Sequence, residues 1–529
     1  MFYSKSLIFK HFCDYFGSLF IDLSEKQLGN PLFQSGYYVL LGFGMYQNKA
    51  IQILKTFSAH EIRQFADFVV SPFFNKNETI IRLFDILFDC YPEFDAPIIE
   101  RTALFKAVYG DDIPIEEQKL RYALSDLTKL LEEYICVKAV DEEELFKYHL
   151  LLYSYRQRLL DKPFMATLKH AEKVLEDWPR RDVSHAFYQY LIEEDKYKFS
   201  SVQKEHTLES NLQQVVDNLD KYFILNKMRY SAEIINNRNV VAINYRLFLY
   251  EEIMNHLRNN PLDHVPAAKV YYNVILTLTD PENKRHYENL LSLLNEHKDI
   301  FSHDELFDMY VYAKNFCIRK INNGHTEFMN ELFSLYKVIL NNKIIFRENY
   351  LSQWDYKNII YLGLRLEEFD WVKSFIHEYN DSLDPRYRKN AYTYNMAYYH
   401  FFLSEYDKTL TLLQSVDFSD VYYHLDSKSL LLKTYYELDA TEAFFSLVDA
   451  FKVYIKRNKQ IPAHQKTNYN NLIKFVTRLY KWKLNPKKKL SDIAEEMDRT
   501  KPLADVIWLR KKIEDALEEE EKLSGKWRS

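Results

Sequence analysis

Residues 366–370 read Leu-Glu-Glu-Phe-Asp, and residues 403–407, which begin 37 positions further along, read Leu-Ser-Glu-Tyr-Asp. The two copies share the pattern Leu-x-Glu-aromatic-Asp, and each stands between apolar stretches with helical spacing. A period in the thirties is typical of helix pairs that stack side by side. We therefore expect helical hairpins, because one hairpin cannot bury its apolar face until another stacks on it.

The composition also favours helices. The chain has 529 residues but only 9 glycines and 14 prolines, which is too few for the turns of a large sheet or for glycine-lined active-site loops. Prolines recur at short breaks between apolar-periodic segments, where they mark helix ends. Residues 134–140 (YICVKAV) have the composition of a strand and leave one short exception open. The expected fold class is all-α.

Two helix N-termini are predicted from capping boxes. Ser58 and Ser302 are each preceded by a phenylalanine and followed three residues later by a glutamate. The serine can accept a hydrogen bond from the third amide of the helix, and the glutamate can accept one from the amide of the capping residue. Beyond Ser302 the apolar residues recur at spacings of three and four, and Cys317 is among them. We expect Cys317 to be a buried thiol and not a nucleophile.

The clearest repeat unit runs over residues 390–420. Its small, turn and core positions are Ala397, Tyr406, Leu410 and Leu413. Equivalent residues lie 34 to 37 positions upstream at Gly363, Phe369 and Ile376, and the following unit, at a spacing of about 35, has Leu438, Phe444 and Val448. This pattern resembles the tetratricopeptide superfamily, although Ser404 and Thr409 stand where that family usually has glycine and alanine.

From about Met45 onward the chain also resembles a family of uncharacterised bacterial helical-repeat proteins. The segments that carry this resemblance are SPFFNKN, CIRKINNG, LGLRLEEFDW and LLLKTYYEL. The two resemblances imply an α-solenoid of stacked antiparallel helix pairs that acts as a protein-interaction scaffold. They imply no catalytic residues and no cofactor.

Four segments are expected along the chain. Residues 1–44 hold five of the nine glycines and form an atypical N-terminal extension, which we expect to be dispensable for folding. Residues 45–160 form a helical N-terminal region, and residues 161–460 form the solenoid of helical hairpins. Residues 461–529 form C-terminal capping helices that cover the apolar face of the last repeat.

A partner-binding groove is predicted from the repeat register. In tetratricopeptide repeats, positions 2, 5, 9 and 13 of the first helix of each pair line the concave side. Counting Thr393 as position 4 places Ala391 of the middle unit, and Asp426 and Ser429 of the following unit, among the positions on this face. A face that is aromatic in the centre, with cations to one side, suits an extended or helical peptide. Packing against the next helix pair is the alternative role for these rings. The groove residues expected to bind the partner are Lys357, Tyr361, Arg365, Tyr394, Tyr398, Phe402 and Lys433.

Residues 102–135 suggest a second possible function, which is DNA binding. Their layout of helix, turn and leucine-spaced helix resembles the helix-turn-helix of transcriptional regulators that carry helical repeats behind it. The second helix would offer Lys119, Arg121 and Lys129 to a DNA backbone, but acidic residues are interspersed with these cations. The alternative function is therefore a DNA-binding regulator.

Other classes of function find little support. The chain lacks the short motifs of nucleotide-binding loops, metalloproteases and serine hydrolases, so we expect no enzyme, no small-molecule substrate and no metal site. Its net charge of −6 argues against nucleic acid as the main partner. The uncharged stretch at residues 27–48 is interrupted by Pro31 and glycines, which argues against a membrane segment. Four scattered cysteines fit a reducing cytoplasm.

Overall fold

The computed structural model describes residues 48–203, 211–240, 245–416, 421–485 and 490–526. Its elements are α2 to α24 and three short 3-10 turns, and the described residues contain no strand. Two isolated β-bridges pair Arg347 with Tyr350 and Leu351 with Leu383. The prediction of an all-α protein is confirmed. The predicted N-terminal extension, residues 1–44, lies outside the described residues.

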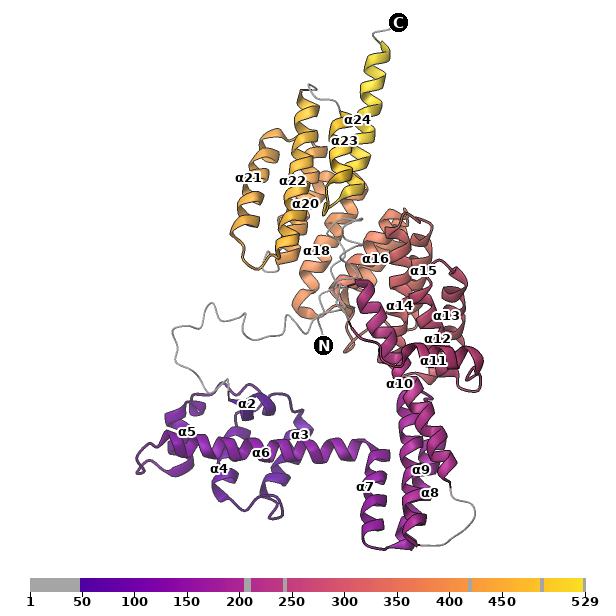
Figure 1. Ribbon diagram of the computed structural model, residues 1–529. Coiled ribbons are helices and arrows are strands. Elements are labelled where there is room, and N and C mark those ends of the chain that lie inside the picture. The colour runs from indigo at the N-terminus through magenta and orange to yellow at the C-terminus, as the bar shows by residue number, and fades with distance from the viewer. Residues whose placement is uncertain (1–47, 204–210, 241–244, 417–420, 486–489, 527–529) are drawn as a thin grey trace. The chain divides into compact units, whose positions relative to one another are not determined.

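The described chain divides into two compact units, which we treat separately. The first contains the described residues up to Trp178 together with Ser184–Leu219, and the second contains Pro179–Val183 and Asp220–Ser529. The division therefore falls after Trp178 and within α10, whereas the sequence placed the start of the hairpins at residue 161. Figure 1 shows the helices of both units.

The described part of the first unit contains eight complete helices. They are α2 (Lys49–Leu54), α3 (Ala59–Val70), α4 (Glu78–Phe88), α5 (Arg101–Tyr109), α6 (Glu117–Glu142), α7 (Glu144–Gln157), α8 (Asp161–Asp177) and α9 (Val183–Gln203). The predicted box at Ser58 is complete, because the serine accepts from the amide of Glu61 and the Glu61 carboxylate accepts from the amide of Ser58. Residues 134–140 lie inside α6, so the strand considered for them is wrong.

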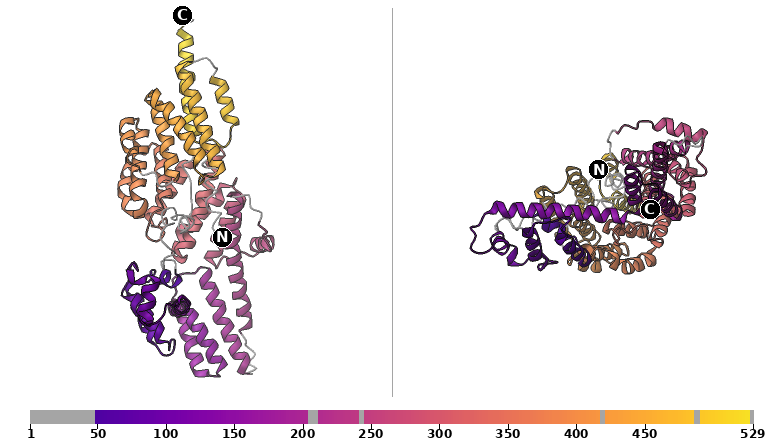
Figure 2. Two further views of the ribbon diagram at one scale, coloured as in Figure 1. Left: turned by 90° about the vertical axis from the view of Figure 1, so that its left-hand side faces the viewer. Right: turned by 90° about the horizontal axis from the view of Figure 1, so that it is seen from below.

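The second unit is a succession of helices. They are α10 (Leu212–Val240), which begins in the first unit, α11 (Tyr250–Asn259), α12 (Pro266–Thr279), α13 (Lys284–His297), α14 (His303–Asn322), α15 (Phe328–Asn341), α16 (Gln353–Arg365), α17 (Phe369–Glu378), α18 (Pro385–Phe402), α19 (Tyr406–Leu413), α20 (Val421–Glu437), α21 (Thr441–Arg457), α22 (Ala463–Leu484), α23 (Leu490–Arg499) and α24 (Val506–Lys526). Figure 2 shows these helices from two further directions.

Even-numbered and odd-numbered helices differ in what they pack against. Helix α12 packs on α14, and α16, α18, α20 and α22 pack on one another in sequence. Each odd-numbered helix from α13 to α21 packs mainly on the two even-numbered helices next to it in the chain. The even-numbered helices therefore contact one another within α12–α14 and within α16–α22, and each odd-numbered helix packs against the two beside it.

Small residues set how closely the hairpins approach. Gly363 lies where α16 meets α17, and a Cβ atom at this position would overlap Cγ2 of Val372 and lie 3.2 Å from the Phe333 ring. The equivalent residue of the next repeat, Ala397, is fully buried. These positions require small side chains because helix interiors are close-packed. Tyr406, the first residue of α19, is only half-buried.

The C-terminal helices close the apolar core of the last hairpins. Leu503, Leu509 and Ile513 join the side chains of α20, α21 and α22 in one buried cluster. Polar side chains such as Arg510 face away from it and are exposed. This arrangement leaves the end of the second unit with a polar outer surface.

A candidate site on the even-numbered helices

Buried polar side chains are concentrated on one set of helices. From α12 to α22, every described helical residue that is both polar and buried lies on an even-numbered helix, except Thr409 of α19. We call the central part of this set the polar face. It consists of Lys314 and Asn315 on α14, Gln353, Lys357 and Asn358 on α16, Asn395 on α18, Asp426, Ser429 and Lys433 on α20, and Asn468 on α22.

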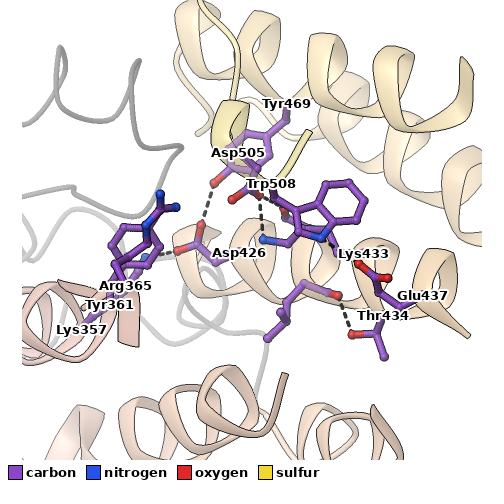
Figure 3. A network of polar contacts seen from close by, with 12 residues as sticks. Lys357, Tyr361, Arg365, Asp426, Lys433, Thr434, Glu437, Tyr469, Asp505 and Trp508 are labelled. Atoms are coloured by element: carbon purple, nitrogen blue, oxygen red, sulfur yellow. Dashed lines mark hydrogen bonds and ion pairs between the residues drawn. The ribbon is translucent and has the colours of Figure 1, made fainter. Parts of the chain in front are cut away.

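One ion pair of the polar face joins α16 to α20. The Lys357 ammonium donates to Oδ2 of Asp426, and both side chains are almost completely buried. The Tyr469 hydroxyl of α22 donates to Oδ1 of the same carboxylate over 2.8 Å. Figure 3 shows Asp426 between the α16 residues and Tyr469. Burial raises the pKa of Asp426 and outweighs the attraction of Lys357, so the charged carboxylate is costly to keep in this place.

A second buried pair joins α20 to the segment before α24. Nζ of Lys433 lies 3.0 Å from Oδ2 of Asp505, and the Ser429 hydroxyl donates to the same oxygen over 2.8 Å. The backbone of Asp505 is left-handed, with φ of 52°. This conformation is uncommon for residues other than glycine, and Asp and Asn tolerate it best. The C-terminal segment thus brings a carboxylate onto the face of α20.

Aromatic rings lie beside both lysines. Nζ of Lys357 lies 5.6 Å from the centroid of the Tyr394 ring, and Nζ of Lys433 lies 5.5 Å from that of the Tyr398 ring. The Tyr361 and Tyr398 centroids are 5.8 Å apart. A cation at this distance from a ring is attracted by its electron-rich face. Each ammonium group is therefore held by a carboxylate and by rings of α18.

The structure brings the predicted groove residues together, as the repeat register implied. However, it buries most of them. Five side chains are less than 5% exposed, and the expectation that they line an open surface does not agree with this burial. They are Lys357, Tyr361, Tyr394, Tyr398 and Lys433. Arg365 and Phe402 are half-buried and keep some exposed area. The role of the seven residues in binding a partner stays a prediction.

Several polar atoms of α16 are buried without a partner. The amide oxygen and nitrogen of Asn358, Oε1 of Gln353 and Nε1 of Trp354 form no hydrogen bond within the described part of the chain. All three side chains are at most 3% exposed. Buried polar groups are nearly always paired, so three such side chains within the six residues 353–358 need an explanation. No sequence pattern had marked Asn358, Tyr469 or Asp505 as candidates for this site.

The helix-turn-helix-like segment at residues 102–135, the alternative DNA-binding site, lies in α5 and α6, with residues 110–116 between the two helices. Two of the three cations on its second helix pair with acidic neighbours: Nζ of Lys119 lies 2.7 Å from Oε1 of Glu116, and Nζ of Lys129 lies 2.8 Å from Oδ1 of Asp126. Arg121 lines an open cavity of about 420 Å³ together with Arg101 and the apolar side chains of α5 and α6. Nothing in this geometry selects DNA over another ligand.

The described residues contain no group of three His, Cys, Asp or Glu side chains placed to hold a metal ion. None of their helices combines the length and the apolar character that crossing a membrane would require. Comparisons of the chain with protein-family models, with curated proteins and with solved structures gave no match.

Proposed function

We propose that the protein is an interaction scaffold without catalytic activity. In this proposal α12 to α22 form an α-solenoid, and the polar face of the even-numbered helices binds a peptide or protein partner. The reducing cytoplasm suits such a protein, because Cys90, Cys136 and Cys317 are free thiols.

The observation that carries the proposal is the unequal distribution of buried polar residues. A helix layer that serves stability alone is best filled with apolar side chains, as α15 and α17 are. Burying an ion pair gives little net stability, since removing two charges from water costs about as much as their attraction returns. The two buried lysine–aspartate pairs and the unpartnered amide of Asn358 are therefore better explained by binding than by folding.

The proposal is tested by photo-crosslinking in the native cell. The photoreactive amino acid p-benzoylphenylalanine replaces Phe402, which lies beside the polar face and keeps exposed area. The matched control carries the same group in place of Val453, which is 46% exposed on the odd-numbered helix α21. We expect a discrete protein adduct from position 402 and none from position 453.

Both variants must retain the helical circular dichroism and melting temperature of the unmodified chain. Adducts from position 453 alone, or from neither position, would contradict binding at the polar face. Adducts that also form when the crosslinker is placed at Arg365 would extend the contact along α16, since Arg365 lies two turns beyond Lys357 on the same helix.

The DNA-binding alternative predicts a different result. A duplex would bind through Arg121 of α6, and its affinity would fall steeply with salt because each phosphate contact releases counterions. Arg121→Ala would then weaken duplex binding and leave the crosslink at position 402 unchanged. The ion pairs of Lys119 and Lys129 with their acidic neighbours make this function the less favoured of the two.

A further inference from the structure

The first unit has a cavity lined mainly by residues of α5 and α6, two helices that pack on each other (Figure 1). Its volume is about 420 Å³. Sites for small molecules typically enclose roughly 300–1,000 Å³, so the cavity is large enough to hold one. All of its lining residues belong to the first unit, whereas the polar face belongs to the second. We call it the α5–α6 cavity.

The buried part of the lining is apolar. Phe105 of α5 and Leu120 and Leu124 of α6 line the cavity, and each of these side chains is at most 4% exposed. Ile115, in the segment between the two helices, also lines it and is 47% exposed. Apolar surface that remains in contact with water favours a ligand with a hydrocarbon body, because covering this surface releases water from it.

The exposed part of the lining carries the charges. Nη1 of Arg101, the first residue of α5, lies 3.9 Å from Oε2 of Glu117. This contact is weak because both side chains are exposed. Arg121 lies one turn beyond Glu117 on α6 and forms no hydrogen bond or ion pair with any described residue. These three residues are the charged ones in the lining, so two cations and one anion leave one net positive charge.

This arrangement selects the charge of a ligand. A guanidinium group matches the geometry of a carboxylate, to which it can donate two parallel hydrogen bonds. One net positive charge balances one negative charge. The Glu117 carboxylate in the wall would repel a dianion such as a phosphate monoester, or a polyanion such as DNA, because like charges brought together are costly. A carboxylate with a single negative charge therefore suits the cavity best.

We propose that the α5–α6 cavity binds a monocarboxylic acid with an apolar body. The carboxylate pairs with Arg121, and the hydrocarbon part covers Phe105, Leu120 and Leu124. The inference goes beyond the scaffold function, because it gives the first unit a ligand of its own. A free small acid and the C-terminus of a peptide share this chemistry, and the test distinguishes these two sources.

The test measures ligand binding to the full-length chain by saturation-transfer-difference NMR, which detects weak ligands. The probe is octanoate. Two further probes have the same hydrocarbon tail: 1-octanol carries no charge, and octylamine carries a positive one. We expect octanoate to bind, 1-octanol to bind about tenfold more weakly, and octylamine to show no binding. A tenfold ratio corresponds to the loss of one hydrogen bond to a charged group.

Substitutions of Arg121 test the role assigned to its charge. Arg121→Gln should weaken the binding of octanoate about tenfold and leave that of 1-octanol unchanged. Arg121→Glu should reverse the preference, so that octylamine binds and octanoate does not. The matched control is Arg63→Gln: Arg63 is an exposed residue of α3 that does not line the cavity, so this variant should bind octanoate as the wild type does. Each variant must retain the helical circular dichroism and melting temperature of the wild type.

Three results would overturn the inference. They are no binding of octanoate to the wild type, equal binding of octanoate to the wild type and to Arg121→Gln, and binding of 1-octanol as tight as that of octanoate. The first and third need no variant. Duplex DNA that binds through Arg121 while octanoate does not bind would also contradict the inference and would favour the DNA-binding alternative.

The source of the carboxylate is read from a last pair of probes, the acetylated tripeptide Gly-Gly-Leu and its C-terminal amide. Tighter binding of the tripeptide acid than of octanoate would assign the cavity to a peptide C-terminus, and weaker binding would assign it to a free acid. Equal binding of the tripeptide acid and its amide would contradict recognition of a carboxylate. The crosslink at position 402 tests the scaffold function separately, because Phe402 belongs to the second unit.

Discussion

Lys357 of α16 donates a hydrogen bond to Asp426 of α20, although the two residues lie 69 positions apart and a complete helical hairpin separates them in the chain. Both side chains are almost completely buried. The pair therefore links two repeats through charges that are shielded from water. Its strength depends on the balance between the attraction of the two groups and the cost of removing them from solvent.

Lys357→Met is expected to destabilise the second unit by about 3–5 kcal/mol, because Asp426 would remain buried without its cation. The double variant Lys357→Met with Asp426→Leu should recover most of this loss, since it removes both charges. Hydrogen exchange of α16 to α22 during urea titration measures the change. Lys408→Ala is the control: its pair with Glu405 is exposed and should contribute about 1 kcal/mol or less. A double variant as unstable as Lys357→Met would show that the charges themselves stabilise the fold.

Gly363→Ala tests the close packing of α16 on α17. The added methyl group would overlap Cγ2 of Val372 and press on the Phe333 ring, so we expect a loss of about 1–3 kcal/mol. The combination with Val372→Ala should restore part of the loss by making room for the methyl group. Thermal unfolding of the three variants provides the measurement. A melting temperature of Gly363→Ala equal to that of the wild type would mean that the hairpin is packed more loosely than the structure indicates.

The three described cysteines should react with iodoacetamide in a fixed order. Cys136 is exposed and should be labelled first, whereas Cys90 is partly buried and burial raises its pKa. Burial raises the pKa of Cys317 to about 12, and its thiol donates to the Tyr287 hydroxyl over 3.2 Å. Because the thiolate is the reactive form, Cys317 should be labelled only after unfolding in urea. Mass spectrometry of digested samples reads the order, and early labelling of Cys317 would place it outside the core.

Glu305, near the start of α14, should make the stability of the second unit depend on pH. The Tyr271 hydroxyl donates to its carboxylate over 2.7 Å. Burial, reinforced by Asp182, nevertheless raises the pKa of Glu305 above its usual value of 4.5. The folded protein therefore favours the protonated form. The stability that this form contributes is complete below pH 4.5 and is lost as the pH rises through the higher folded-state pKa.

Glu305→Gln should remove this contribution to the pH dependence, since glutamine resembles the protonated acid. Melting temperatures of both proteins from pH 4.5 upward provide the test. We expect the wild type to lose more stability over this range than the variant. Parallel curves would show that Glu305 is ionised in the folded protein despite its burial.

The repeat signal in the sequence was sufficient to predict the helices around it. Residues 366–370 and 403–407 lie at the turns between α16 and α17 and between α18 and α19, because a helix end and an aromatic residue recur there. Residues 134–140 were misread because their β-propensity is local, whereas Leu124, Leu127 and Leu131 continue one buried helical face into Tyr134. The helix that this buried face forms continues through residues 135–140, which are mostly exposed.

The candidate site was predicted less well than the fold. The repeat register was enough to predict that Lys357 of α16 and Tyr394 of α18 share one face, since equivalent positions of successive repeats align. It could not show that this face is buried. That burial depends on partners such as Asp505, which directly precedes α24 and contacts Ser429 and Lys433. The sequence around Asp505 shows no repeat pattern from which this contact could be predicted. Unpartnered atoms such as those of Asn358 can be recognised only when all neighbours are known.

The central claim is that polar side chains are kept on the even-numbered helices for binding and not for stability. The most direct measurement is the free energy of unfolding of Asn358→Leu. Because the Asn358 amide has no partner within the described residues, its removal should leave the stability unchanged or raise it by about 1–3 kcal/mol. A loss of more than about 1 kcal/mol, outside the range of neutral substitutions, would contradict the account and make Asn358 a structural residue.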